Sequence, residues 1–166
     1  MTVRFQELKE HHLPRIKSIY NWYVHNSTAT FHTQPVDTDE LKSFIYIGHP
    51  TYKSFIILLG EEMAGYCYLT RHKPRQAYDR TAEVTVYLKP EFQNKGIGGL
   101  ALAHLENQAR TVGLKNIIGG ISGDNATSIA LFEKAGFAKC AHYKNVGEKF
   151  GKILDVVAYQ KELKQK

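Results

Sequence analysis

The chain has 166 residues, of which 43% are hydrophobic and 23% are charged, so it can bury a core and is neither disordered nor fibrous. We expect residues 1–166 to form a single domain. Lysine and arginine number 22 against 16 aspartate and glutamate residues, and this net charge of +6 favours an anionic partner. The basic residues are scattered, and the sequence contains neither a membrane-spanning stretch nor a nucleic-acid recognition motif. We therefore expect no membrane and no nucleic acid among its partners.

The cysteines and histidines indicate a reducing compartment and no metal site. Cys67 and Cys140 lie far apart, which argues against a disulfide scaffold and against a paired-cysteine metal site. The eight histidines lack the spacing of metal ligands. The N-terminal residues 1–5 lack the basic-then-apolar order of a signal peptide. We therefore expect a cytoplasmic protein.

The first half of the chain predicts three strands and two helices. A short strand is expected at residues 3–8, and apolar residues at helical spacing predict a helix over 13–24. Residues 26–35 have the composition of a loop, and Asp37 or Thr38 can cap a second helix that ends near residue 48. Strands are then expected over 53–59 and 63–70, joined as a hairpin across residues 60–62.

After a polar, basic loop at residues 71–80, the second half predicts strands with helices between them. Helices are expected over 96–113 and 125–135, the latter closed by Gly136, and strands over 81–88, 116–121, 137–143 and 153–160. Strands outnumber helices, and helices lie between the strands of this half. The pattern predicts an α/β domain with a mixed sheet.

The segment from Leu88 to Gly99 has the composition of an anion-binding loop. A strand ends there, and glycines open the next helix, where unpaired backbone N–H groups carry partial positive charge and suit a phosphate. Lys95 adds a full positive charge. A glycine-rich helix start without a ligand is the competing interpretation.

Two other motifs fit the sequence less well. Gly96, Gly98 and Ala101 match the dinucleotide fingerprint, but the loop after Leu88 is too long for its tight turn, and the next strand lacks the acid that holds a ribose. Ser122 lies in Gly-Ile-Ser-Gly-Asp, which fails the hydrolase pattern G-x-S-x-G at its last position.

Two motifs in order identify a family resemblance. Gln93-x-x-Gly96-x-Gly98 resembles the pyrophosphate loop of the GNAT family of N-acetyltransferases, and residues 125–128 with 131–137 resemble the family's second motif. Residues 26–31, 73–87 and 146–156 are similar to the phosphinothricin and methionine sulfoximine acetyltransferase branch, and the likeness extends over residues 16–163. The resemblance implies an α/β GNAT fold, with a mixed central sheet of about six to seven strands and about four flanking helices.

The resemblance also implies an activity: transfer of the acetyl group of acetyl-CoA to the amino group of a small amine. Glu83 would be the catalytic base, acting directly or through a water. The competing interpretation of Glu83 is a strand residue paired with Arg80 or Arg75. The implied cofactor-binding residues are Val86, Tyr87, Leu88, Gln93, Asn94, Lys95, Gly96, Ile97, Gly98, Gly99, Asn125, Ser128 and Lys134. The implied substrate-binding residues are Phe31, Lys73, Arg75, Tyr78 and Thr85. Lys134, Lys73 and Arg75 are equally open to interpretation as solvated surface residues.

The chain departs from the family pattern at a few positions on the acceptor side. Phe132 stands where tyrosine or histidine is common and cannot protonate a thiolate, so the general acid is unassigned. Arg80, Ile153 and His32 also replace frequent family residues. A peptide or protein N-acetyltransferase and a non-catalytic acyl-CoA sensor are the alternatives on the same fold. The branch also implies a homodimer.

Overall fold

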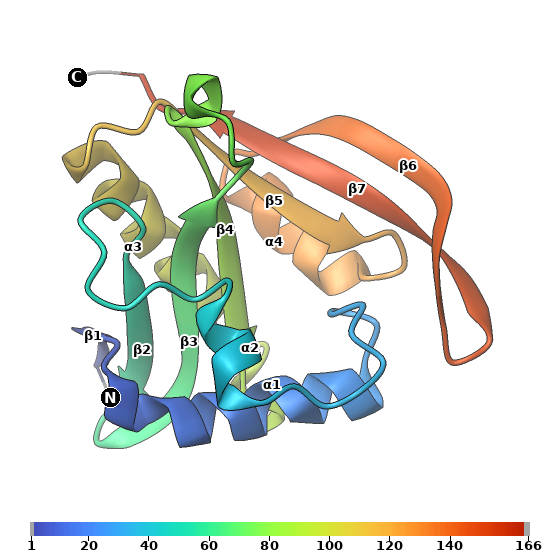
Figure 1. Ribbon diagram of the computed structural model, residues 1–166, viewed down its shortest axis with the longest axis horizontal. Helices are drawn as coiled ribbons and strands as arrows, with labels where there is room; N and C mark the ends of the chain where they lie inside the picture. The colour runs from blue at the N-terminus through green and yellow to red at the C-terminus, as the bar shows by residue number, and fades with distance from the viewer. Residues whose placement is uncertain (1, 165–166) are drawn as a thin grey trace.

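The computed structural model describes residues 2–164 and contains one seven-stranded sheet in the order β1-β2-β3-β4-β5-β7-β6 (Figure 1). Every neighbouring pair is antiparallel except β4 and β5, which run parallel. The strands are β1 (Val3–Glu7), β2 (Ser54–Leu59), β3 (Glu62–Arg71), β4 (Thr81–Leu88), β5 (Asn116–Ser122), β6 (Ala138–Lys149) and β7 (Lys152–Glu162). The expected mixed sheet is confirmed.

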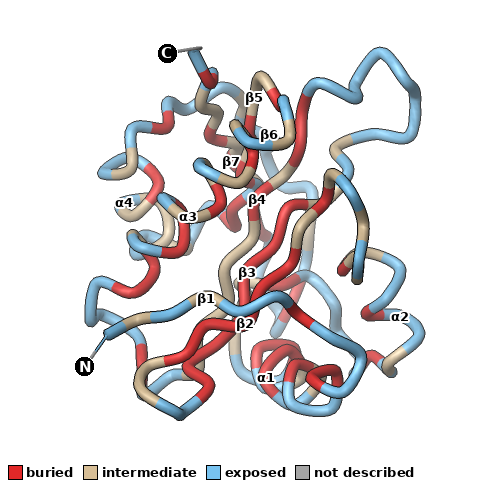
Figure 2. The backbone as a smooth tube through the Cα atoms, turned by 90° about the vertical axis from the view of Figure 1, so that its left-hand side faces the viewer, coloured by how far each residue is buried: buried red, intermediate tan, exposed pale blue. Residues whose placement is uncertain are grey.

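Four α-helices cover the two faces of the sheet: α1 (Leu13–Asn26), α2 (Thr38–Lys42), α3 (Ile97–Thr111) and α4 (Ala126–Lys134). Figure 2 shows α1 on one face of β2 and β3, with α3 and α4 on the other. Successive strand residues point to opposite faces, so Ile56 and Tyr66 join the α1 core whereas Ile57 and Cys67 join the α3 core. The central strands are therefore apolar on both sides.

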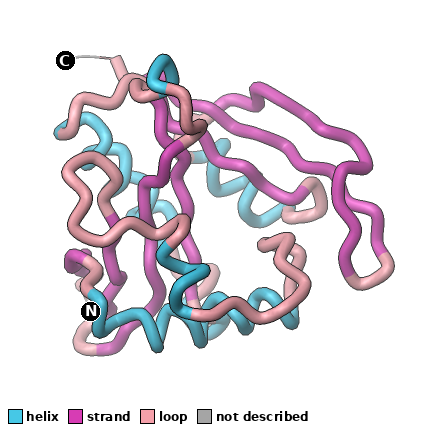
Figure 3. The backbone as a smooth tube through the Cα atoms, viewed as in Figure 1, coloured by secondary structure: helices cyan, strands magenta, loops and turns pink. Residues whose placement is uncertain are grey.

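The helix boundaries differ from the prediction at α2. Asp37 caps this helix as expected, with its carboxylate accepting a hydrogen bond from the Glu40 N–H at 2.9 Å. The helix ends at Lys42 rather than near residue 48. Figure 3 shows the loops on both sides of this short helix, and Phe44 from the following loop faces the cavity described below.

The sheet opens between its two parallel strands. Residues 81–83 of β4 pair with residues 116–118 of β5, and beyond Glu83 the described part of β4 pairs with β3 alone. Strand β5 instead continues along β7 to Ser122. Figure 1 shows the two strands diverging from this point. The second half of β4 therefore keeps backbone groups that no neighbouring strand uses on its β5 side.

Strands β6 and β7 form a long hairpin that projects from the body of the molecule (Figure 1). The predicted strands over 137–143 and 153–160 are too short. The pairing continues to the tip beyond two irregularities in the register, at residues 139–141 and 143–147, which interrupt the alternation of side chains. Phe150 and Gly151 turn the chain at the tip with φ angles of 54° and 73°. Among the described residues, no helix is long and apolar enough to cross a membrane.

Candidate active site

A cavity of about 930 Å³ lies where β4 and β5 part. Its lining comes from the end of α1 and the loop after it, from β3 and β4, from the loop before α3, from the end of β5 and from the start of α4. Elements that are far apart in the sequence therefore meet at the opening of the sheet.

The loop before α3 presents its backbone to this cavity. Gly96 caps the helix with a φ of 80°, and a Cβ built there would meet no atom within 4 Å. Gly98 serves packing instead, because a Cβ there would lie 2.9 Å from the Leu131 Cδ2 atom of α4. An unencumbered helix start with free N–H groups fits a diphosphate, so this observation supports the expected anion site.

The Gln93 side chain connects this loop to α1. Its amide donates a hydrogen bond to the Tyr23 hydroxyl at 2.6 Å, and that hydroxyl donates to the Leu88 carbonyl. Burial raises the pKa of Tyr23, so the phenol stays protonated and keeps both contacts. The Gln93 side chain thus holds the end of β4 and the loop in a fixed relation.

Glu83 lies in the same cavity and has a partner that the sequence analysis missed. Its Oε2 atom is 2.9 Å from Nδ1 of His72, whereas Arg75 and Arg80, the partners in the competing interpretation, form no ion pair with it in the described structure. The pairing of β3 with β4 sets Thr70 opposite Glu83, so His72 follows two residues later on the same side. The register of β3 on β4 is therefore the signal that identifies His72 as the partner of Glu83.

Aromatic and hydroxyl side chains line the cavity near Glu83. The Tyr20 hydroxyl lies 2.6 Å from the Thr30 Oγ1 atom and 2.5 Å from the His32 Nδ1 atom. Burial raises the pKa of Tyr20, which keeps its phenol neutral. Phe31 packs on the projecting β6–β7 hairpin (the arm), where a Cβ on Gly147 would lie 2.5 Å from its ring.

Asp124 connects two sides of the cavity. Its Oδ1 atom accepts hydrogen bonds from Ser122 at 2.6 Å and from Thr28 at 2.8 Å, and its Oδ2 atom accepts one from the Lys152 ammonium at 3.1 Å. Burial alone would raise the pKa of Asp124, but these donors outweigh it and lower the pKa below its ordinary value. The ionised carboxylate therefore stabilises the fold.

We expect Asp124→Asn to lower the free energy of unfolding at pH 7 by about 1–2 kcal/mol. Because the folded state lowers this pKa, the stabilisation is present above the ordinary Asp value of 3.8 and is lost as the pH falls through the folded value. Urea titrations at several pH values test this. The gap between wild type and variant should shrink below about pH 4, and a gap independent of pH would contradict the assignment.

A buried lysine holds the loop that follows α1. The Lys149 ammonium on β6 donates to the carbonyls of Ser27 at 2.6 Å, Thr30 at 2.7 Å and Tyr23 at 3.5 Å. Burial lowers the pKa of Lys149, whose residue is 4% exposed. A cation at the last carbonyls of a helix is favourable, and here it also fixes Ser27 and Thr30, which line the cavity.

The expected site residues divide into those that line the cavity and those that do not. Lining the cavity are Glu83, Val86, Tyr87, Leu88, Gln93, Asn94, Gly96, Gly98, Gly99, Asn125, Ser128, Phe31 and Thr85. Outside its lining are Lys95, Ile97, Lys134, Lys73, Arg75 and Tyr78.

Three of these placements have clear physical reasons. Ile97 is buried in the core, so its backbone alone is available to a ligand. The Lys95 ammonium lies 5.8 Å from the centroid of the Phe92 ring. Asn125 lines the cavity as the cap of α4, and its side-chain oxygen already accepts a hydrogen bond from the Ser128 N–H at 3.1 Å.

Phe132 also lines the cavity, with its ring against Phe137 and over β5. A Cβ on Gly119 would lie 2.2 Å from this ring, so glycine is required there. The ring supplies no hydroxyl, which leaves the general acid unassigned.

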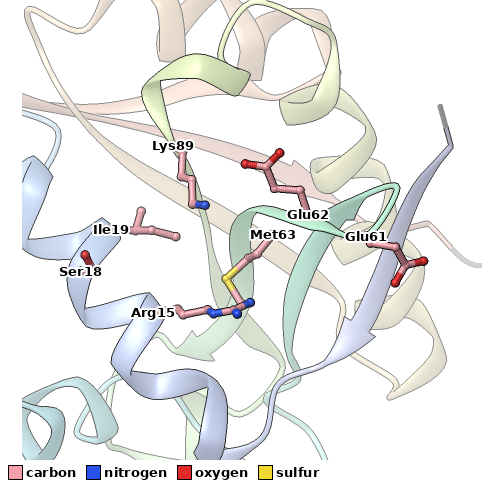
Figure 4. A pocket seen from close by; sticks show the side chains of 7 residues that line it. All are labelled: Arg15, Ser18, Ile19, Glu61, Glu62, Met63 and Lys89. Carbon is pink, nitrogen blue, oxygen red and sulfur yellow. The ribbon is translucent and has the colours of Figure 1, made fainter.

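A second hollow of about 600 Å³ lies on another part of the surface, between α1 and the turn from β2 to β3 (Figure 4). Arg15, Glu62 and Lys89 are among its lining residues, and no expected site residue is. Among residues 2–164, no group of three or more His, Cys, Asp or Glu side chains could hold a metal ion.

The comparisons with known proteins decide the family. The model of the acetyltransferase (GNAT) family matches residues 16–137. The chain is 30% identical to phosphinothricin N-acetyltransferase of Streptomyces coelicolor, over 93% of this chain and 92% of that one. It is 32% identical to L-methionine sulfoximine/L-methionine sulfone acetyltransferase of Salmonella typhimurium, over 98% and 95%.

The chain belongs to the GNAT family of acetyltransferases. A crystal structure of a phosphinothricin acetyltransferase from Sinorhizobium meliloti, in complex with acetyl-CoA, has a TM-score of 0.91 and 30% identity, covering 98% of this chain and 89% of that one. The expected GNAT fold and the expected class, an acetyl-CoA-dependent N-acetyltransferase, are confirmed.

Proposed function

We propose that this GNAT enzyme transfers the acetyl group of acetyl-CoA to the amino group of an amino acid or analogue such as phosphinothricin or methionine sulfoximine, with Glu83 as the general base. The observation that carries the proposal is that Glu83 and the free helix start at Gly96 line one cavity at the opening of the sheet. The named acceptors are those of the relatives. The role of Glu83 as the base and the identity of the acceptor are the two parts that we propose.

The residues of the cavity supply what the reaction needs. Acetyl-CoA supplies an activated acetyl group. Glu83 takes a proton from the ammonium, because only the free amine attacks. The amine nitrogen bonds to the acetyl carbon as the carbon–sulfur bond breaks, and the nitrogen gives its surplus proton to water. Water in turn protonates the thiolate, because Phe132 carries no hydroxyl.

The chain's backbone would hold the co-substrate. Within residues 86–88, the backbone N–H groups that point to the β5 side have no partner strand there and suit the amides of the pantetheine arm and the thioester oxygen. The loop from Gln93 to Gly99 suits the diphosphate. We also assign Asn125 and Ser128 to the pantetheine arm of acetyl-CoA. We assign Lys95 and Lys134 to the charged end of acetyl-CoA, which their flexible side chains can reach from outside the cavity.

The acceptor would lie between Glu83 and the aromatic side chains. Phe31 and Thr85 line this part of the cavity. Lys73, Arg75 and Tyr78 lie outside its lining on the loop between β3 and β4, where the two cations suit an acceptor carboxylate.

The proposal is tested by free-thiol release from acetyl-CoA with a panel of amino acids, their analogues and short peptides. We expect release with one or more free amino acids or analogues, above the rate without acceptor. Release with peptides alone would favour a peptide N-acetyltransferase. Tight acetyl-CoA binding by calorimetry without release would favour a non-catalytic sensor.

We also propose a homodimer, supported by the projecting arm. Tyr143, Val146, Phe150 and Ile153 are all 57–58% exposed, and they gather on β6, β7 and the turn between them. A second copy would bury this apolar surface. The cytoplasmic location also remains a prediction.

We expect light scattering to give twice the monomer mass for the wild type and the monomer mass for Ile153→Asp, because a carboxylate in the contact would be desolvated. Lys144→Met, on an exposed site of the same arm, is the control and should leave the mass unchanged. A monomeric wild type would contradict this proposal.

A further inference from the structure

The carboxylate of Glu83 is held at one oxygen. Its Oε2 atom accepts a hydrogen bond from the His72 ring at 2.9 Å, and among the described residues its Oε1 atom has no hydrogen-bond partner. The Glu83 side chain is 39% exposed and that of His72 is 21% exposed, so the histidine is the more sheltered of the two. An ionised carboxylate only accepts hydrogen bonds, so Nδ1 carries the hydrogen. In the neutral ring Nε2 then carries none.

The His72 ring is itself held in place. Its centroid lies 5.5 Å from that of Tyr78, with an edge-to-face angle of 79°. Tyr78 comes from the short 3-10 helix Gln76–Tyr78 between β3 and β4. This contact restrains the His72 ring. Tyr78 therefore acts on the site through His72, although it lies outside the cavity lining.

The charged and titratable groups around the pair are few. From β3, Arg71 lies over the Tyr52 ring, and Tyr68 is a phenol kept neutral because burial raises its pKa. Lys73 follows His72 on the exposed loop, and Tyr78 covers the ring. Ile118 of β5, opposite Glu83, carries no charge. Within the described structure, no lysine or arginine nitrogen lies within 4 Å of the Glu83 carboxylate, whose one ion-pair partner is His72.

We infer that His72 is a positioning residue for Glu83: it fixes Oε2 through Nδ1–H and directs Oε1 to the acceptor ammonium. This inference rests on the proposed function. The hydrogen bond holds the carboxylate in one orientation and leaves Oε1 open to the acceptor.

Two variants separate the hydrogen bond from the packing of the ring. His72→Asn keeps a side-chain N–H close to the position of Nδ1, and His72→Phe keeps a ring against Tyr78 but donates nothing. We expect His72→Phe to lower kcat about tenfold with the acetyl-CoA KM unchanged. His72→Asn should recover most of this loss, because it retains a hydrogen-bond donor to Oε2. His11→Asn, at an exposed site away from the cavity, is the matched control.

Wild-type kcat in His72→Phe would overturn the inference. Equal losses of kcat in both variants would also overturn it, because they would indicate packing alone.

NMR of enzyme with ¹⁵N-labelled histidine provides a readout that needs no turnover. We expect the Nδ1–H tautomer of His72 in the wild type and its loss in Glu83→Ala. An Nε2–H tautomer in the wild type would overturn the inference. If the wild type acetylates no amine, the proposed function fails, and this measurement still decides whether the pair exists.

Discussion

Replacing Glu83 with glutamine is expected to lower kcat about 100- to 1,000-fold at neutral pH, because the amide cannot take a proton from the acceptor ammonium. Glutamine keeps the size of the side chain and can still accept the hydrogen bond from His72. The cofactor loop starts ten residues later on another part of the cavity surface, so the acetyl-CoA affinity should change less than twofold. Steady-state kinetics with calorimetry of acetyl-CoA binding gives both values.

The pH dependence sharpens this test. A free amine, supplied at high pH, needs no base, so the deficit of Glu83→Gln should narrow as the pH approaches the acceptor's own pKa. Glu62→Gln, at an exposed position at the start of β3, is the control and should behave as wild type. An undiminished rate in Glu83→Gln would remove Glu83 from the mechanism.

Replacing Lys149 with methionine is expected to lower the free energy of unfolding by about 2–4 kcal/mol. Methionine fills similar space but leaves the carbonyls of Ser27 and Thr30 without their donor. Both residues line the cavity, so the acceptor KM should rise while the acetyl-CoA KM changes little. Chemical denaturation and the two KM values check the prediction.

The control for Lys149→Met is Lys144→Met, which removes the same charge from an exposed position on the same strand. It should change the unfolding free energy by less than about 0.5 kcal/mol. Equal effects of the two substitutions would show that charge, rather than the buried hydrogen bonds, accounts for the loss.

Features that depend on a short stretch of sequence could be predicted. Glycines between a strand and a helix place Gly96 at a helix start, and a polar residue before an apolar helix places the cap of α2 at Asp37. Alternation of strands and helices predicts the mixed sheet. The glutamate on β4 came from the family resemblance, since a strand residue of this kind is more often a surface residue.

Features that depend on tertiary contacts could not be predicted. His72 meets Glu83 through the register of β3 on β4, which no local pattern specifies. Lys149 reaches the end of α1 across 122 residues of sequence, and Thr28 reaches Asp124 across 96. The arm was predicted too short because its register irregularities interrupt the alternation of apolar residues.

The most direct test of the account is mass spectrometry of the products formed from acetyl-CoA labelled with ¹³C in its acetyl group. The account predicts that the label appears in the N-acetyl group of an amino acid or analogue in the wild type and is nearly absent from that product in Glu83→Gln. Label recovered as acetate alone, or equal labelling of the amine by both enzymes, would contradict it.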